Sequence, residues 1–185
     1  CEQMDFEVPD YVAVPTSSGG NIRGVLKGSE EFRLCGLTRK VPEMICVQAG
    51  GCSPIYDAYN GAEETISRVA SPHTIAHAIE NPYPPSGNEV LRRLRGGRGP
   101  FVTVTDEEIL WAQRRLATEG IFAQPASAAP LAAVGKLRSS GVINGNAIVV
   151  CIVTGSGLKY TAALAKYEFR VLSGKLADLS DLLAV

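Results

Sequence analysis

The chain has 185 residues with a formal net charge of −1 at pH 7, and this balance gives no electrostatic basis for binding nucleic acid or acidic membrane surfaces. Its five cysteines are odd in number and form no Cys-x-x-Cys pair, which argues against a disulfide framework or a zinc site and favours reduced thiols in the cytoplasm. No apolar run approaches the roughly 20 residues that span a bilayer. We therefore expect residues 1–185 to form a single cytoplasmic α/β domain with no membrane or nucleic-acid partner.

The predicted secondary structure alternates between strands and helices along the chain. Short runs rich in β-branched and apolar residues predict strands at 11–15, 44–48, 101–104 and 147–153. Patterning and turn residues predict helices at 20–34, 54–69, 73–80, 87–96, 105–119, 125–140 and 159–167. This alternation indicates a mostly parallel sheet with helices on both faces, a three-layer, doubly wound α/β fold. Beyond these elements, apolar residues between 170 and 185 predict a short docking helix.

The first predicted strand ends in a run of small residues. It stops at Pro15, and the sequence Ser17-Ser18-Gly19-Gly20-Asn21 leads directly into the next helix. A helix N-terminus leaves backbone N–H groups unpaired, and its dipole favours an anion. The pattern matches neither a Walker loop nor a dinucleotide fingerprint. It predicts a phosphate cradle, with an ordinary tight turn as the alternative.

The strand predicted at 147–153 has a similar ending. It is apolar throughout, as expected for a strand buried on both faces, and Thr154 follows it with glycines on either side of Ser156. Ligands of open α/β sheets bind at the carboxyl ends of the strands. Two strand ends, one suited to phosphate and one offering a hydroxyl, fit a phosphorylated heterocycle between them. Alternatively, Thr154 only bonds to the backbone.

His73 and His77 stand four residues apart, which on a helix would place them on one face and suggest a metal pair. No acidic or cysteine residue is placed to complete such a site. We expect local hydrogen bonding or capping, with a role in the cleft as the alternative, and no metal centre.

Three blocks of sequence, 17–21, 119–129 and 154–159, occur in an order that resembles the threonine synthase family. These are pyridoxal-phosphate enzymes of fold type II, in the tryptophan-synthase-β-like group. The resemblance implies pyridoxal phosphate as cofactor, with Ser17, Ser18, Gly19, Gly20 and Asn21 around its phosphate and Thr154 at its ring nitrogen. It also implies a substrate side formed by the 48–51 turn, including Ala49 and Gly50, and by Gln124.

The resemblance further implies conversion of O-phosphohomoserine, a phosphorylated amino acid, to threonine by β,γ-elimination and replacement. Threonine dehydratase-like and cysteate synthase-like enzymes are alternatives, and so is a truncated non-catalytic module. None of the residues before Ser17 is the family's Schiff-base lysine. We therefore expect the carboxyl-terminal part of a larger enzyme, with no catalytic residue of its own, inactive alone, and working as a homodimer or with the missing amino-terminal part. Gln124 departs from the family's glutamate, which puts the substrate in doubt.

Overall fold

The computed structural model describes residues 1–166, 174–175, 177 and 180. Its strands are β1 (Tyr11–Pro15), β2 (Glu43–Ala49), β3 (Phe101–Val104) and β4 (Val149–Cys151). Its α-helices are α1 (Gly20–Leu34), α2 (Pro54–Asn60), α3 (Gly87–Leu94), α4 (Asp106–Thr118) and α5 (Pro125–Ser139). Four short 3-10 segments complete the described part: η1 (Glu2–Met4), η2 (His77–Ile79), η3 (Gly157–Lys159) and η4 (Thr161–Lys166).

The four strands form one parallel sheet in the order β3-β2-β1-β4. Tyr11 at the start of β1 pairs with Glu43 on one side and with Val149 on the other, and Cys46 of β2 pairs with Phe101 of β3. The chain moves outward from β1 through β2 to β3 and then returns to the opposite side of β1 to form β4. The predicted α/β fold with a parallel sheet is confirmed.

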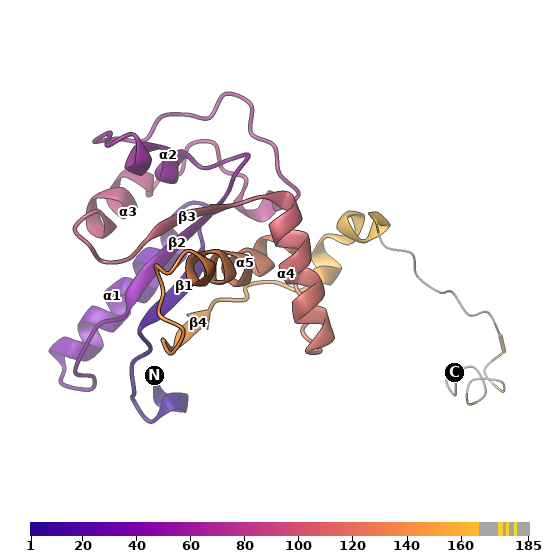
Figure 1. The fold of residues 1–185 in the computed structure, drawn as a ribbon, viewed down its shortest axis with the longest axis horizontal. Helices are drawn as coiled ribbons and strands as arrows, with labels where there is room; N and C mark the ends of the chain where they lie inside the picture. Colours follow the sequence, from indigo (N-terminus) through magenta and orange to yellow (C-terminus); the bar gives the residue numbers. More distant parts are fainter. Residues whose placement is uncertain (167–173, 176, 178–179, 181–185) are drawn as a thin grey trace.

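Helices cover both faces of this sheet (Figure 1). Alternate residues of β1 pack on opposite faces of the sheet. Ala13 belongs to a core with α4 and α5, whereas Val12 and Val14 belong to a core with α1, α2 and α3. Two buried hydrophobic layers therefore hold the central strands, which explains why β1 and β2 are almost continuously apolar. No helix in the described part is both long and apolar enough to cross a membrane.

This topology creates a switch point between β1 and β4. The connection after β1 runs over one face through α1, whereas the chain reaches β4 from α5 on the other face. The loop after β1 and the segment after β4 consequently diverge at the carboxyl edge of the sheet. Open α/β folds bind ligands at such a point.

The predicted helix at 54–69 is wrong beyond Asn60. Gly61 ends α2, and two backbone donors further along the predicted helix bond to distant partners. The N–H of Ile66 donates to Asn88 Oδ1 at 2.8 Å, and the N–H of Val69 donates to the Pro82 carbonyl at 3.0 Å. These long-range bonds replace the i to i−4 bonds that a helix would require.

The predicted helix at 73–80 is also wrong, because only η2 forms there. The N–H of Thr74 donates to Glu80, its hydroxyl donates to Asp106 at 2.6 Å, and the N–H of Ile75 donates to the same Asp106 carboxylate. Asp106 opens α4, so this segment is held against a helix that follows much later in the sequence.

Two further predictions differ at the carboxyl end of the described chain. The strand expected at 147–153 is shorter, since Pro15 of β1 has no N–H to extend the ladder beyond the Ala13–Cys151 pair. The helix expected at 159–167 appears as η3 and η4. The apolar residues that predicted a docking helix between 170 and 185 lie outside the described residues.

Candidate functional site

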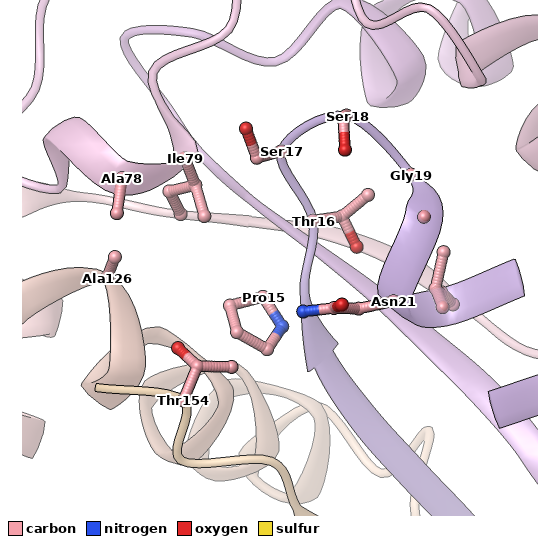
Figure 2. Close-up of a pocket in the computed structure, with 12 residues that line it drawn as sticks. Pro15, Thr16, Ser17, Ser18, Gly19, Asn21, Ala78, Ile79, Ala126 and Thr154 are labelled. Carbon is pink, nitrogen blue, oxygen red and sulfur yellow. The ribbon is translucent and has the colours of Figure 1, made fainter. Parts of the chain in front are cut away.

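A cavity of about 110 Å³ lies at the switch point (Figure 2). One wall is the loop from Pro15 to Asn21, which joins β1 to α1. The opposite side is formed by Thr154 after β4 and by Ala126 in the first turn of α5, and η2 contributes Ala78 and Ile79. Polar groups therefore occupy two ends of the cavity, with apolar side chains between them.

The loop end is rich in unused hydrogen-bond donors. Within the described residues, the backbone N–H groups of positions 17 to 22 meet no acceptor. The N–H groups on either side of this run are paired, since Thr16 donates to the Val47 carbonyl and Arg23 donates to the Gly19 carbonyl. These free donors surround the N-terminus of the 15-residue helix α1, whose dipole adds a partial positive charge. The arrangement can bind an anion with several oxygen acceptors.

The shape of this loop is fixed from behind by α3. Gly19 adopts φ of +90°, a conformation that favours glycine, and a Cβ at this position would lie 2.9 Å from Val90. The N–H of Ser86 donates to the Ser18 carbonyl at 3.0 Å. Arg23 bonds to the Ser86 hydroxyl at 2.8 Å and to Glu89 at 2.6 Å, which ties α1 to the N-terminus of α3.

At the other end of the cavity, Thr154 bonds to a side chain. Its hydroxyl oxygen lies 2.8 Å from Ser127 Oγ, which also accepts the N–H of Gly155 at 2.8 Å. Ser127 is 1% exposed, whereas Thr154 is exposed where it lines the cavity. The alternative in which Thr154 bonds only to the backbone does not describe this geometry.

The structure brings some predicted site residues together and leaves others outside. The loop 17–21 and Thr154 line the same cavity, as the position of two strand ends on one sheet edge predicted. Ala49, Gly50 and Gln124 do not line it. Ala49 is fully buried, the Gly50 N–H donates to the Val104 carbonyl, and the Gln124 side chain lies against Gly155. Their substrate-side role stays a prediction.

Gln48, from the same predicted turn, has a structural role. Its Oε1 accepts the N–H groups of Ile55 and Tyr56 at 2.9 and 3.0 Å, and so it satisfies two free donors at the N-terminus of α2.

Sequence reasoning missed Ala78, Ile79 and Ala126 as cavity walls, and Ser127 as the partner of Thr154. Ala126 and Ser127 lie in the first turn of α5, within the 119–129 block. A hydroxyl in that turn, next to a predicted ligand edge, was the available signal. Ala78 and Ile79 gave no such signal in the sequence, because their position depends on the contacts of η2 with α5.

His77 has hydrogen-bonding partners of its own in this structure. His77 Nε2 lies 2.9 Å from the Tyr160 hydroxyl, and His77 Nδ1 lies 3.3 Å from Glu80. The described residues contain no cluster of three or more His, Cys, Asp or Glu side chains arranged for a metal. Among the cysteines, burial raises the pKa of Cys46 to about 12 and that of Cys151 to about 11, so neither forms a thiolate readily at neutral pH.

Comparison with known proteins identifies the family of this chain. Residues 1–155 match the family described as "Pyridoxal-phosphate dependent enzyme". The chain belongs to that family. Its cofactor is therefore pyridoxal phosphate, as the sequence blocks predicted.

The curated relatives point to one branch of the family. A threonine synthase from Methanocaldococcus jannaschii is 41% identical over 160 residues, which cover 86% of this chain and 40% of that protein. One from Methanosarcina acetivorans is 42% identical over 159 residues, covering 85% of this chain and 39% of that protein. The chain thus spans about 40% of the length of these relatives, and it is similar to the corresponding portion of each.

Solved structures agree on the fold. A fungal L-serine ammonia-lyase from Rhizomucor miehei superimposes with a TM-score of 0.69 at 20% identity, covering 90% of this chain and 53% of that one. Threonine deaminase isoform 2 from Solanum lycopersicum gives a TM-score of 0.66 at 16% identity, covering 90% and 47%. At these identities the likeness shows the fold alone.

Proposed function

We propose that this chain forms the part of a threonine synthase-like enzyme that holds the phosphate and the ring nitrogen of pyridoxal phosphate. The observation that carries the proposal is the single cavity at the switch point, with unpaired N–H groups of residues 17–22 at one end and the Thr154 hydroxyl at the other. Pyridoxal phosphate carries a phosphate at the end of a methylene arm and a pyridine nitrogen in the ring, meta to that arm. The donors present fit both groups.

Each part of the site has a distinct task. The loop amides, assisted by the hydroxyls of Ser17 and Ser18, bind the phosphate dianion and anchor the cofactor. Ala126 and Ile79 present apolar surface to the ring and exclude water from it. Thr154 offers the ring nitrogen a neutral hydroxyl, which unlike a carboxylate does not hold that nitrogen protonated.

When bound, pyridoxal phosphate supplies an electron sink for reactions at the carbons of an amino acid. A neutral partner at its nitrogen weakens that sink, which favours elimination and replacement over transamination. We assign O-phosphohomoserine as substrate and threonine as product on the strength of the threonine synthases at 41–42% identity. No lysine lines the cavity in the described part of the chain, so the loop and Thr154 act as binding groups.

The test uses the full-length gene product with pyridoxal phosphate. Phosphate release and threonine formation from O-phosphohomoserine are measured, with 2-oxobutyrate formation from threonine as the parallel assay. We expect threonine formation, and we expect Thr154→Val to weaken cofactor binding about 10-fold, as the loss of one well-placed hydrogen bond implies. Production of 2-oxobutyrate alone would instead identify a dehydratase. If neither threonine nor 2-oxobutyrate forms and Thr154→Val binds the cofactor as tightly as the wild type, the assignment of the site is refuted.

A further inference from the structure

The contact between Ser127 and Thr154 bears on how the ring nitrogen is recognised. Ser127 is the third residue of α5, and its hydroxyl points out of the helix toward the end of β4. Two groups of the segment after β4 converge on it: the Gly155 N–H and the Thr154 hydroxyl, each at 2.8 Å. In the described part of the chain these are the partners of Ser127 Oγ.

The direction of the Ser127–Thr154 hydrogen bond follows from an account of the protons. A serine hydroxyl has one proton to donate and can accept from other donors. The Gly155 N–H can only donate, so it occupies an acceptor position of Ser127 Oγ. Ser127 is 1% exposed, and a buried hydroxyl proton needs an acceptor. Thr154 Oγ1 is the acceptor available to it, so Ser127 donates and Thr154 accepts.

This direction determines what Thr154 offers to the cavity. With its oxygen accepting from Ser127, the single proton of Thr154 is free to point into the cavity that the residue lines. Thr154 therefore presents a donor. An unprotonated pyridine nitrogen is an acceptor and pairs with it, whereas a pyridinium N–H would face another proton and be left unpaired.

We propose that Ser127 is a positioning residue that orients the Thr154 hydroxyl as a donor and thereby keeps the cofactor's ring nitrogen unprotonated. The proposal rests on the proposed function, since it assumes that Thr154 meets that nitrogen. It adds a chain of three hydrogen bonds: Gly155 N–H to Ser127, Ser127 to Thr154, and Thr154 to the ring. Without Ser127 the Thr154 hydroxyl can rotate, and it can then accept from a protonated nitrogen as readily as it donates.

The test probes the ring nitrogen in the full-length gene product. The probe is 4′-deoxypyridoxine 5′-phosphate labelled with ¹⁵N in the ring, which keeps the phosphate and the nitrogen but lacks the reactive aldehyde. Its ¹⁵N chemical shift reports protonation, and its Kd reports affinity. In wild-type protein at neutral pH we expect the shift of an unprotonated pyridine. In Ser127→Ala we expect a shift toward the pyridinium position and an approximately 10-fold higher Kd.

Two further variants control for folding. Ser127→Thr keeps the hydroxyl and should keep the wild-type ¹⁵N shift. Ser140→Ala removes a hydroxyl from the other end of α5, where it bonds to the Leu137 carbonyl, and should leave both the ¹⁵N shift and the Kd unchanged. The melting temperature of each variant is recorded beside these values.

A double variant separates positioning from a general effect on the fold. Once Thr154→Val has removed the hydroxyl, adding Ser127→Ala should change the Kd by less than about 2-fold, because Ser127 acts through Thr154. A full 10-fold effect in that background would overturn the proposal, and so would a wild-type ¹⁵N shift in Ser127→Ala. If Thr154→Val alone leaves the Kd unchanged, the assignment of Thr154 to the ring nitrogen fails as well. If Thr154→Val raises the Kd and only the Ser127 results differ from expectation, the positioning role of Ser127 fails and the assignment of Thr154 stands.

Discussion

At the scale of single residues, two adjacent glycines in the anion-binding loop have different tasks. Gly19 has φ of +90°, and a Cβ there would lie 2.9 Å from Val90 Cγ2 and 3.0 Å from Ser86 Cβ. Gly20 has no positive φ, and the nearest atom to an added Cβ is Ser18 Oγ at 3.7 Å. Of these two positions, only position 19 requires glycine, because the chain there adopts a left-handed backbone conformation in close contact with α3.

Gly19→Ala should lower the free energy of unfolding by about 1–3 kcal/mol, because it combines a left-handed backbone with a close contact to Val90. Gly20→Ala is the matched control. At its ordinary backbone conformation we expect no loss of stability, or a gain of up to about 1 kcal/mol. Urea denaturation of the full-length gene product measures both. Equal losses in the two variants would contradict the distinction drawn between these glycines.

At the scale of elements, α4 begins with a complete capping box. The Thr105 N–H donates to Glu108 Oε2 at 2.8 Å, and the Glu108 N–H donates to Thr105 Oγ1 at 3.2 Å. Acidic residues 106 to 108 also lie in the first turn, where the helix dipole favours them. Asp106 in addition binds Thr74 and Ile75, so the start of this helix holds the segment that leads into η2 and the cavity wall.

Thr105→Ala should therefore reduce the free energy of unfolding by about 1 kcal/mol, the usual effect of losing an N-cap side chain. Thr118→Ala provides the control on the same helix, because its hydroxyl bonds only to the Arg115 carbonyl one turn earlier. We expect a change within about 0.5 kcal/mol for that variant. Thermal and chemical denaturation monitored by circular dichroism would show the difference, and a Thr118→Ala loss as large as that of Thr105→Ala would count against the capping role.

At the scale of the whole molecule, the sheet separates two hydrophobic cores. Leu91 of α3 and Ile109 of α4 are both fully buried, but they belong to different cores on opposite faces. The site lies at the carboxyl edge of β1 and β4, between the two layers. Both layers must therefore be in place for the cavity to form.

Leu91→Ala and Ile109→Ala should each lower the free energy of unfolding by about 2–4 kcal/mol through lost burial and a residual cavity. Because the two side chains share no core partners, the double variant should show the sum of the single effects to within about 0.5 kcal/mol. Denaturant titrations of the four proteins in the cycle measure the coupling. A coupling above about 1 kcal/mol would mean that the sheet transmits packing changes between its faces.

Local chemistry made much of this architecture predictable. The apolar runs at 11–15 and 147–153 predicted strands near the observed β1 and β4, and the capping box located the start of α4. Parallel strands end on the same edge of a sheet, so the loop 17–21 and Thr154 could be placed together before any coordinates. Glycine, serine and helix-start patterns act over a few residues, which is why the sequence reveals them.

Tertiary structure alone decided the rest. Residues 61–69 and 73–80 have helix-compatible sequences, but their polar groups bond to Asn88, Pro82 and Asp106, and no local pattern encodes a partner so far along the chain. The same holds for the walls that η2 contributes and for the bond between Ser127 and Thr154, which joins residues 27 positions apart. Local patterns of residues were enough to identify the sheet edge and the hydrogen-bond donors on it. The packing of α4, α5 and η2 around that edge decided the cavity, because its walls come from elements whose positions depend on long-range contacts.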